Sequence, residues 1–442
     1  MNHAMEQAQS QCQEMRQFTA RVDLLFYAAY VPWLAYGLIS GSFFMQKLDA
    51  FPFLNWNNLS ILATTTLLIR ELVCACERKG PQSNDGLGVA STSMAAMVIL
   101  VFVCGTGVFT RNVYKLFVDL FFMFAARNID KNGLIKCSYY CMTICLIVIL
   151  CASLLDVIPN YMLIQGTRIR YCLGFRYCLV PSNRLFVVTC LWCLMKEERM
   201  SLIGATLFLI INYIMYLLTD SRLVFAASIA VVAFFLLQAY IGRTGLRFHV
   251  PTRIVRVILG NSTVLCIVVT AIVTLAYGIA LSYSPEFASR LGSMFGHRIM
   301  RGCEGLVGMG VKMFGQSVSW VGNGLSSDGT SSVALGKTYN YVDNIYLHVL
   351  IEQGIAFAAI HFILLNVLSR RAVRRQMMGM AVVIAAIAVC GLLDDHALTS
   401  NYNPFILLAL NDLRVRTTSI REAKVKEIVG GPHACFEGGG TA

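Results

Sequence analysis

The sequence predicts an all-α, polytopic transmembrane bundle of about 12 helices, and three observations lead to this prediction. Hydrophobic residues make up 57% of the 442 residues, and charged residues only 14%, too few to cover a soluble protein of this size. The apolar residues also form runs of about 20, the length of helix that crosses about 30 Å of hydrocarbon. A β-barrel would instead show alternating segments of about 10 residues. The fold class is therefore helical and embedded in a membrane.

Twelve runs along the chain are long enough, or nearly long enough, to be spans. The fourth, which contains Lys115 and Asp119, is weak, as are the sixth and the last, so the total could change by one or two. Together they form one transmembrane domain, residues 22–413, between a polar N-terminal segment, 1–21, and a Gly-rich tail, 414–442. In chain order the expected spans are 22–44, 57–76, 88–105, 107–126, 135–157, 183–195, 201–219, 223–241, 257–281, 343–368, 377–393 and 397–413.

The distribution of Lys and Arg between the spans favours a cytoplasmic location for both termini. With the N-terminus inside, most basic residues fall in inside segments, as the positive-inside rule requires. The net charge of +12 then follows from the topology, and no nucleic-acid partner is expected. Two outer loops are long, at about 158–182 and, between spans nine and ten, at about 282–342. Loops of this length in a compact protein are often functional.

Polar residues gather at the outer ends of the predicted spans, where ionisable groups are costly and usually face a wet cavity. The turn Thr219–Arg222 joins two spans, and a run of polar residues opens the tenth. Arginine also predominates over lysine in the outer loops, and its guanidinium group binds phosphate bidentately. A pyrophosphate at the membrane surface is thus the expected ligand, with a carboxylate as general base. The candidates are Arg170, Arg176, Arg222, Arg290, Arg298, Asp343, Asn344, Tyr346, His348 and Glu352.

Purely structural roles stand beside these functional ones. Asp220 and Arg222 flank a tight turn and could simply pair with each other. His348 and Glu352 are four residues apart and could satisfy each other within a helix. No cofactor is expected, and no group of residues has the spacing of a metal site. Cys172 and Cys178 lie in the first long loop, where a disulfide between them remains open.

Several segments resemble bacterial oligosaccharide repeat-unit polymerases, the O-antigen and capsule polymerase (Wzy-type) family. GNGLSSDG is followed about 20 residues later by VDNIYLHVLIEQGIAF, which is similar to a family motif that enters a late span. TRIRYCLGFRYCLVPSN, LTDSRLVF and NYNPFILL resemble other family segments in the same order. Related O-antigen ligases usually have His where Asp343 stands, so the resemblance favours a polymerase. The spacing from Phe175 to Pro181 is longer than in the family pattern.

The resemblance implies a GT-C-like, metal-independent glycosyltransferase on the outer face of the bacterial cytoplasmic membrane. Its donor would be a glycan on undecaprenyl pyrophosphate, and its acceptor a single lipid-linked repeat unit. Its other partners would be membrane lipids and a chain-length regulator protein. Asp343 would accept the acceptor's proton. The remaining roles fall into three groups: leaving-group neutralisation by Arg222, Arg290 and Arg298; binding of the second pyrophosphate by Arg170 and Arg176; and sugar positioning by Asn344 and Tyr346, with His348 and Glu352 nearby.

Two other functions remain open from the sequence. A flippase for lipid-linked sugars also has about 12 spans, but it needs polar groups through the middle of its spans, accessible from both sides. Here, residues such as Arg70, Lys115, Asp119 and His361 are the few ionisable groups at mid-span. An O-antigen ligase carries out adjacent chemistry and differs only in its acceptor.

Overall fold

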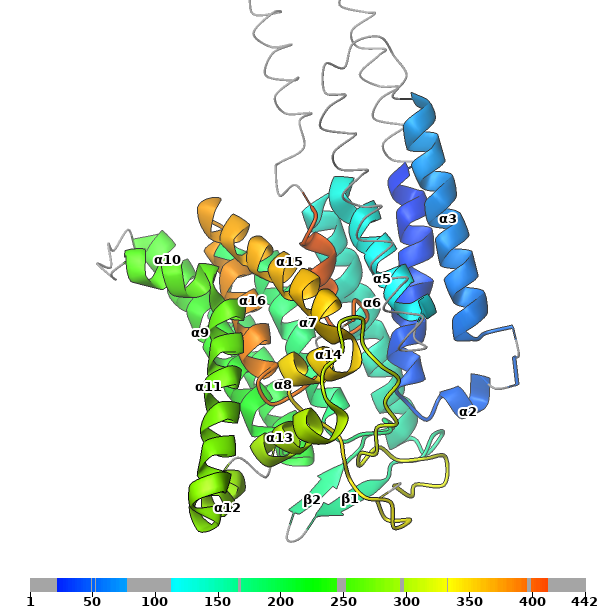
Figure 1. The fold of residues 1–442 in the computed structure, drawn as a ribbon. Helices are drawn as coiled ribbons and strands as arrows, with labels where there is room; N and C mark the ends of the chain where they lie inside the picture. The colour runs from blue at the N-terminus through cyan, green and yellow to red at the C-terminus, as the bar shows by residue number, and fades with distance from the viewer. Residues whose placement is uncertain are drawn as a thin grey trace, which may run out of the picture.

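The computed structural model confirms a chain that is mostly helical (Figure 1). The described residues are 22–48, 50–51, 53–77, 113–165, 168–244, 252–294, 298–331, 333–395 and 399–411. The predicted span 88–105, the N-terminal segment 1–21 and the tail 414–442 lie outside these residues.

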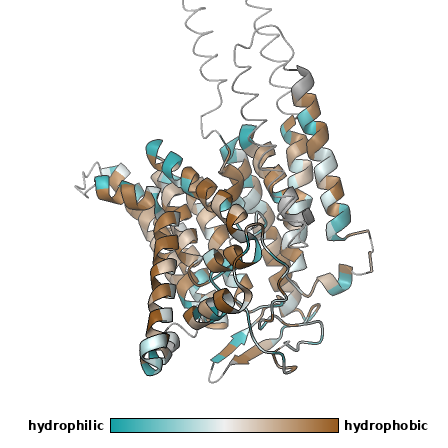
Figure 2. Cartoon of the chain, in the orientation of Figure 1, coloured by the Kyte–Doolittle hydropathy of each residue, from teal (hydrophilic) through white to brown (hydrophobic). Residues whose placement is uncertain are grey.

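Six of the described helices are long and apolar enough to cross a membrane, which supports a membrane protein, whereas the sequence predicts twelve spans. Much of their surface is left uncovered by the rest of the protein: only 22% of the apolar stretch of α8 and 17% of that of α11 is buried. Brown, apolar colour accordingly runs along the sides of the bundle in Figure 2. The six are Val22–Ser40, α6 (Lys131–Leu154), α8 (Leu202–Thr219), α9 (Arg222–Thr244), α11 (Ser262–Tyr283) and α15 (Gly354–Arg374).

Shorter or less apolar helices complete the bundle. Helix α7 (Val180–Lys196) lies at its centre, with side chains buried on every face and contacts to α6, α8, α9 and α16. Pro181 suits the start of α7, where its missing N–H would have no partner within the helix. The others are α2 (Met45–Leu48), α3 (Trp56–Glu77), α5 (Val113–Ala125), η1 (Ala126–Asn128), η2 (Glu197–Arg199) and α16 (Met378–Cys390).

Two of the predicted spans are interrupted. Span 257–281 becomes α10 (Thr252–Gly260) and α11, separated at Asn261. Span 343–368 becomes α14 (Ile345–Glu352) and α15, separated where Gly354 has a φ of +85°. A Cβ at Gly354 would lie 2.2 Å from the backbone nitrogen of Gly315, so only glycine fits there. The interruption thus depends on the packing of a distant loop against this turn.

The last predicted span, 397–413, is not a continuous helix over its described part. Residues 399–403 form turns, and Pro404–Leu408 is a short 3₁₀ helix, η4. Pro404 lacks the N–H that would extend a helix through it. Every residue of η4 is buried by the surrounding helices, which is the setting in which irregular backbone is tolerated at membrane depth.

Most of the loop structure gathers at one end of the bundle, at the bottom of Figure 1, which we call the loop end. An antiparallel hairpin, β1 (Met162–Gln165) with β2 (Arg168–Tyr171), pairs Gln165 with Arg168. Helices α12 (Pro285–Met294) and α13 (Arg298–Met309) pack on α11, and the segment 310–344 then leads to α14. The first long loop therefore contains β-structure that the sequence analysis did not anticipate.

Candidate functional site

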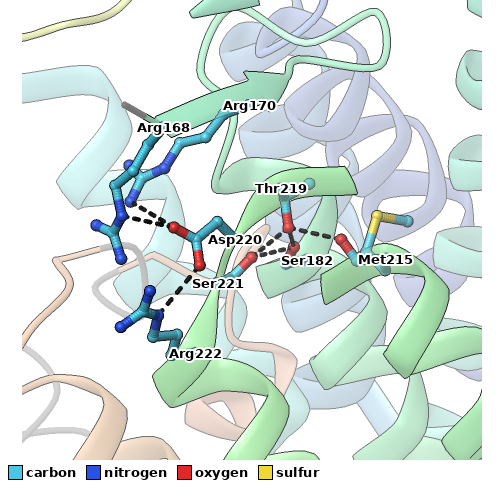
Figure 3. A network of polar contacts seen from close by, with 8 residues as sticks. All are labelled: Arg168, Arg170, Ser182, Met215, Thr219, Asp220, Ser221 and Arg222. Atoms are coloured by element: carbon cyan, nitrogen blue, oxygen red, sulfur yellow. Dashed lines mark hydrogen bonds and ion pairs between the residues drawn. The ribbon is translucent and has the colours of Figure 1, made fainter. Parts of the chain in front are cut away.

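Three arginines converge on Asp220 at the loop end (Figure 3). Asp220 Oδ2 lies 2.7 Å from Arg168 Nε and 3.9 Å from Arg170 Nη2, and its Oδ1 lies 3.1 Å from Arg222 Nε. Arg168 and Arg170 are two residues apart on β2, so both lie on one face of the strand. The pairing of Asp220 with Arg222, which the sequence left open, is thus present. We call these four residues the Asp220 cluster; its arginines outnumber its carboxylate.

The backbone at Asp220 is held by a group of hydroxyls. Asp220 ends α8 with a left-handed φ of +49°, a conformation that Asp tolerates better than most residues. On either side of it in the chain, Thr219 and Ser221 contact each other, and both contact Ser182 of α7, at 2.6 and 2.5 Å (Figure 3). All three hydroxyl residues are buried. The turn between α8 and α9 is therefore anchored to the central helix.

A second group of charges surrounds Asp343. Its Oδ2 lies 3.7 Å from Nε of Arg298, the first residue of α13, and accepts a 3.3 Å hydrogen bond from the Tyr339 hydroxyl. Burial, followed by the charge of Asp343, raises the pKa of Tyr339, so it stays a donor. The same two causes, burial and the charge of Asp343, also raise the pKa of Tyr177. We call Asp343, Arg298, Tyr339 and Tyr177 the Asp343 cluster; Asp343 itself is 21% exposed.

Two more carboxylates, which follow α16, border this cluster. Asn183 Nδ2 of α7 donates a 2.7 Å hydrogen bond to Asp394 Oδ2. The Tyr341 hydroxyl donates a 2.5 Å bond to Asp395 Oδ2, and burial together with that carboxylate raises the pKa of Tyr341. The charges of Asp343 and Asp394 contribute to the same shift. The loop end thus holds three carboxylates close enough to act on one tyrosine.

The segment between β2 and α7 connects the two clusters. It follows β2, which carries Arg170 of the Asp220 cluster, and it includes Tyr177 of the Asp343 cluster. Between them, the buried thiols of Cys172 and Cys178 contact each other, and the Arg170 charge acts on Cys178. Both cysteines are free in this structure, so the disulfide left open by the sequence is not formed here. One segment of the chain therefore contributes residues to both clusters at the loop end.

Asn344 and Tyr346 have partners inside the bundle. Asn344 caps α14: its Oδ1 accepts bonds from the backbone nitrogens of Tyr346 and Leu347, and its Nδ2 donates to the carbonyl of Leu392 at 2.9 Å. The buried Tyr346 hydroxyl donates to the carbonyl of Ala388 at 2.7 Å. These contacts tie α14 to α16, and they supply structural reasons for both residues. Their predicted role in positioning sugars stays a prediction.

His348 and Glu352 form the pair that the sequence offered as the structural alternative. His348 Nε2 lies 3.0 Å from Glu352 Oε2, and both residues are buried. Trp320 stacks on the His348 ring at 4.7 Å between ring centroids, and its Nε1 donates a 2.9 Å bond to Glu352 Oε2. This trio fixes the long loop 310–344 onto α14. A substrate would reach these two side chains only after the loop moved.

Two predicted residues, Arg176 and Arg290, belong to neither cluster as defined here. Arg176 is partly buried, and its Nε has no hydrogen-bond partner among the described residues. Its backbone pairs with Gly41 and Leu325, which places it beneath the long loop. Arg290 is exposed on α12, a helix that packs on α11 and α13.

The site residues predicted from the sequence omit four members of the two clusters: Arg168, Tyr177, Asp220 and Tyr339. Of these, Arg168 stood among the outer-loop arginines, and Asp220 was expected to pair with Arg222. The alternating arginines of Arg168-Ile169-Arg170 carried a usable signal, because a strand would place both on one face. No comparable signal marks the two tyrosines, whose roles depend on a loop fold that brings residues 177 and 339 together. Among the described residues, no three His, Cys, Asp or Glu side chains are grouped so as to hold a metal ion.

Comparison with known proteins adds no assignment to this geometry. No protein-family model matches the chain, and neither the curated proteins nor the solved structures include a significant match.

Proposed function

We propose that the chain is a membrane glycosyltransferase that polymerises oligosaccharide repeat units carried on undecaprenyl pyrophosphate. The observation that carries the proposal is that one end of an apolar bundle holds both an arginine-rich cluster and a partly exposed carboxylate. Arg168, Arg170 and Arg222 supply positive charge for a pyrophosphate, and Asp343 supplies a base. Lipid tails would remain in the bilayer while the polar groups meet at this end.

The proposed reaction transfers the growing glycan from its lipid to the incoming unit. A hydroxyl of the acceptor sugar attacks the anomeric carbon of the donor, and a new glycosidic bond forms. The bond from that carbon to the pyrophosphate oxygen breaks, and undecaprenyl pyrophosphate leaves with the bonding electrons. The proton of the acceptor hydroxyl passes to the Asp343 carboxylate. Stabilisation of the developing charge on the leaving group is worth several kcal/mol when the donors are preorganised, on the order of 3 kcal/mol for one of them.

The proposal assigns these roles according to the contacts within the two clusters. In the proposal, Arg168, Arg170 and Arg222 bind one pyrophosphate, because Asp220 holds their guanidinium groups together. Arg298 orients the Asp343 carboxylate, and Tyr339 donates to the same oxygen.

Arg176 and Arg290 are left as candidates for the pyrophosphate of the second lipid. Arg176 has a buried Nε without a partner among the described residues, and Arg290 is exposed on α12. The product of each cycle is a glycan longer by one unit on the acceptor lipid.

A flippase is the second candidate, and the placement of buried charge argues against it. Arg70 and Arg127 both bind Glu71, at 2.5 and 2.6 Å, near the end opposite the hairpin. Asp119 receives a hydrogen bond from Ser400. These charges are engaged with one another or with neighbouring side chains, whereas a carrier needs polar groups available along its path. A ligase would share the proposed chemistry and differ in its acceptor.

The deciding experiment uses purified full-length protein with a lipid-pyrophosphate-linked repeat unit as the only substrate. A ladder of products, each longer by one unit, is the result expected of a polymerase. Proteoliposomes prepared with labelled lipid provide the second arm. Movement of the label across the bilayer without any ladder would replace the proposal with a flippase. Transfer of one glycan to a different lipid-linked acceptor, with no further growth, would indicate a ligase.

A further inference from the structure

A groove at the end opposite the hairpin is lined by four arginines. Helices α10 and α15 pack against each other there and enclose about 350 Å³. Arg253 and Arg256 come from α10, and Arg370 and Arg374 come from α15. All four are exposed, and none is in an ion pair with a carboxylate in the described part of the chain. Four like charges at one groove repel each other unless an anion lies between them.

One of these arginines is held in place by a neutral group. Asn261, at the break between α10 and α11, accepts two bonds through its Oδ1 from Arg370, at 3.0 Å from Nε and 2.5 Å from Nη2. The Asn261 amide nitrogen in turn donates to the carbonyl of Val257 at 2.8 Å. An amide positions the guanidinium without neutralising it, so its charge remains available to a ligand.

Apolar side chains on α10 lie exposed beside the groove. Ile254, Val257 and Ile258 are 60%, 57% and 50% exposed. A short helix with arginines on one side and large apolar residues on another is typical of a segment that lies in the membrane interface. The apolar residues would contact acyl chains while the arginines remain at headgroup depth.

We propose that this groove binds the phosphodiester headgroup of an anionic phospholipid. The charge selects an anion, the guanidinium forks suit phosphate oxygens, and the exposed isoleucines suit a ligand that carries acyl chains. A basic pocket between membrane helices is a known arrangement for lipid headgroups. An excess of arginine set only by membrane topology could be scattered over the surface. It would not explain why four arginines from two helices line one groove.

The test measures lipid retention by the purified full-length protein with native mass spectrometry, comparing phosphatidylglycerol with phosphatidylcholine. Wild-type protein should retain phosphatidylglycerol preferentially. Each arginine removed near a headgroup weakens binding about fivefold, so R370Q/R374Q should weaken it about 25-fold. R253Q/R256Q, from the other helix, should do the same. R199Q removes another exposed arginine from outside the groove lining and should leave binding unchanged. Equal binding by both double variants and wild type would overturn the proposal.

A second arm separates a lipid site from a site for any free anion. I254N/I258N keeps all four arginines and removes the apolar contact. It should weaken phosphatidylglycerol binding several-fold. Inorganic phosphate at millimolar concentration should compete poorly with the lipid in wild type. Unchanged lipid binding in this variant, together with complete displacement by phosphate, would identify a free-anion site and reject the lipid assignment.

Discussion

Arg168 Nε lies 2.7 Å from Asp220 Oδ2, and this ion pair joins the β1–β2 hairpin to the turn between α8 and α9. The two residues are 52 positions apart in the sequence, so the pair is a product of the tertiary fold. Arg170 and Arg222 approach the same carboxylate. Asp220 thus organises three cations that would otherwise repel each other.

The Asp220 cluster predicts different effects for two substitutions at its centre. Asp220→Asn removes the charge but tolerates the left-handed backbone, and it should destabilise the protein by about 1 kcal/mol, the scale of partly exposed ion pairs. Asp220→Ala should cost about 1 kcal/mol more, because Ala is strained at a φ of +49°. Thermal unfolding in detergent measures both. Equal midpoints for the two variants would contradict the backbone part of this account.

The contacts among Trp320, His348 and Glu352 predict a large loss of stability when one member is removed. Glu352→Gln leaves a buried imidazole without its charged partner and should destabilise the protein by about 3 kcal/mol. Glu304→Gln is the matched control, because Glu304 pairs with Arg301 across one helical turn and is 53% exposed. That change should cost less than about 1 kcal/mol. Similar unfolding midpoints for the two variants would argue that the buried trio does not fix the long loop.

The interruption between α14 and α15 predicts a strict requirement for glycine. Gly354→Ala places a Cβ 2.2 Å from the Gly315 nitrogen and 2.6 Å from the Lys312 carbonyl oxygen. These are backbone atoms, which cannot move away as a flexible side chain could. The free energy of unfolding of the variant should therefore fall by about 3 kcal/mol or more. Gly308→Ala, within α13 and with open space around the new Cβ, should be neutral or stabilising by up to about 1 kcal/mol. The comparison requires only unfolding curves, and a tolerated alanine at position 354 would refute the packing described.

The raised pKa of Tyr341 predicts that the protein loses stability at high pH. Burial and Asp395 raise its pKa above the ordinary value of 10.0, so the folded state binds its proton more tightly than the unfolded state. The stabilisation is complete below pH 10 and decreases as the pH rises above it, by about 1.4 kcal/mol per pH unit for one such group. Tyr341→Phe should reduce the slope of unfolding free energy against pH between pH 10 and 11. An unchanged slope would show that Tyr341 does not titrate differently in the two states.

Sequence patterns predicted the continuous helices well because their signal is local. Spans 201–219 and 223–241 agree closely with α8 and α9, since each apolar run ends at a polar turn. The interruption at Gly354 was not predicted, because apolar residues flank the short polar stretch Glu352-Gln353 and the cause of the break is the approach of Gly315. The 3₁₀ segment at Pro404 was misread for a related reason: buried irregular backbone is as apolar as a helix.

The candidate site was likewise predicted only where the signal is local. Arg170, Arg222, Arg298 and Asp343 were selected by residue type and expected position, and the structure places all four in the two clusters at the loop end. Their partners depend on contacts between distant segments, which a single sequence does not reveal. Asn344 and Tyr346 belong to the same sequence motif as Asp343. Their hydrogen bonds instead connect helices, which gives both residues a structural role.

The central claim is that Asp343 is the base of a glycosyl transfer at the loop end. The most direct test is the rate at which purified protein joins one donor glycan to one lipid-linked repeat unit, measured for wild type, Asp343→Asn and Glu304→Gln. Loss of a general base reduces such rates by about 10² to 10⁴, so Asp343→Asn should fall by at least about 100-fold while Glu304→Gln stays near wild type. A folded Asp343→Asn variant that extends glycans at the wild-type rate would contradict the account.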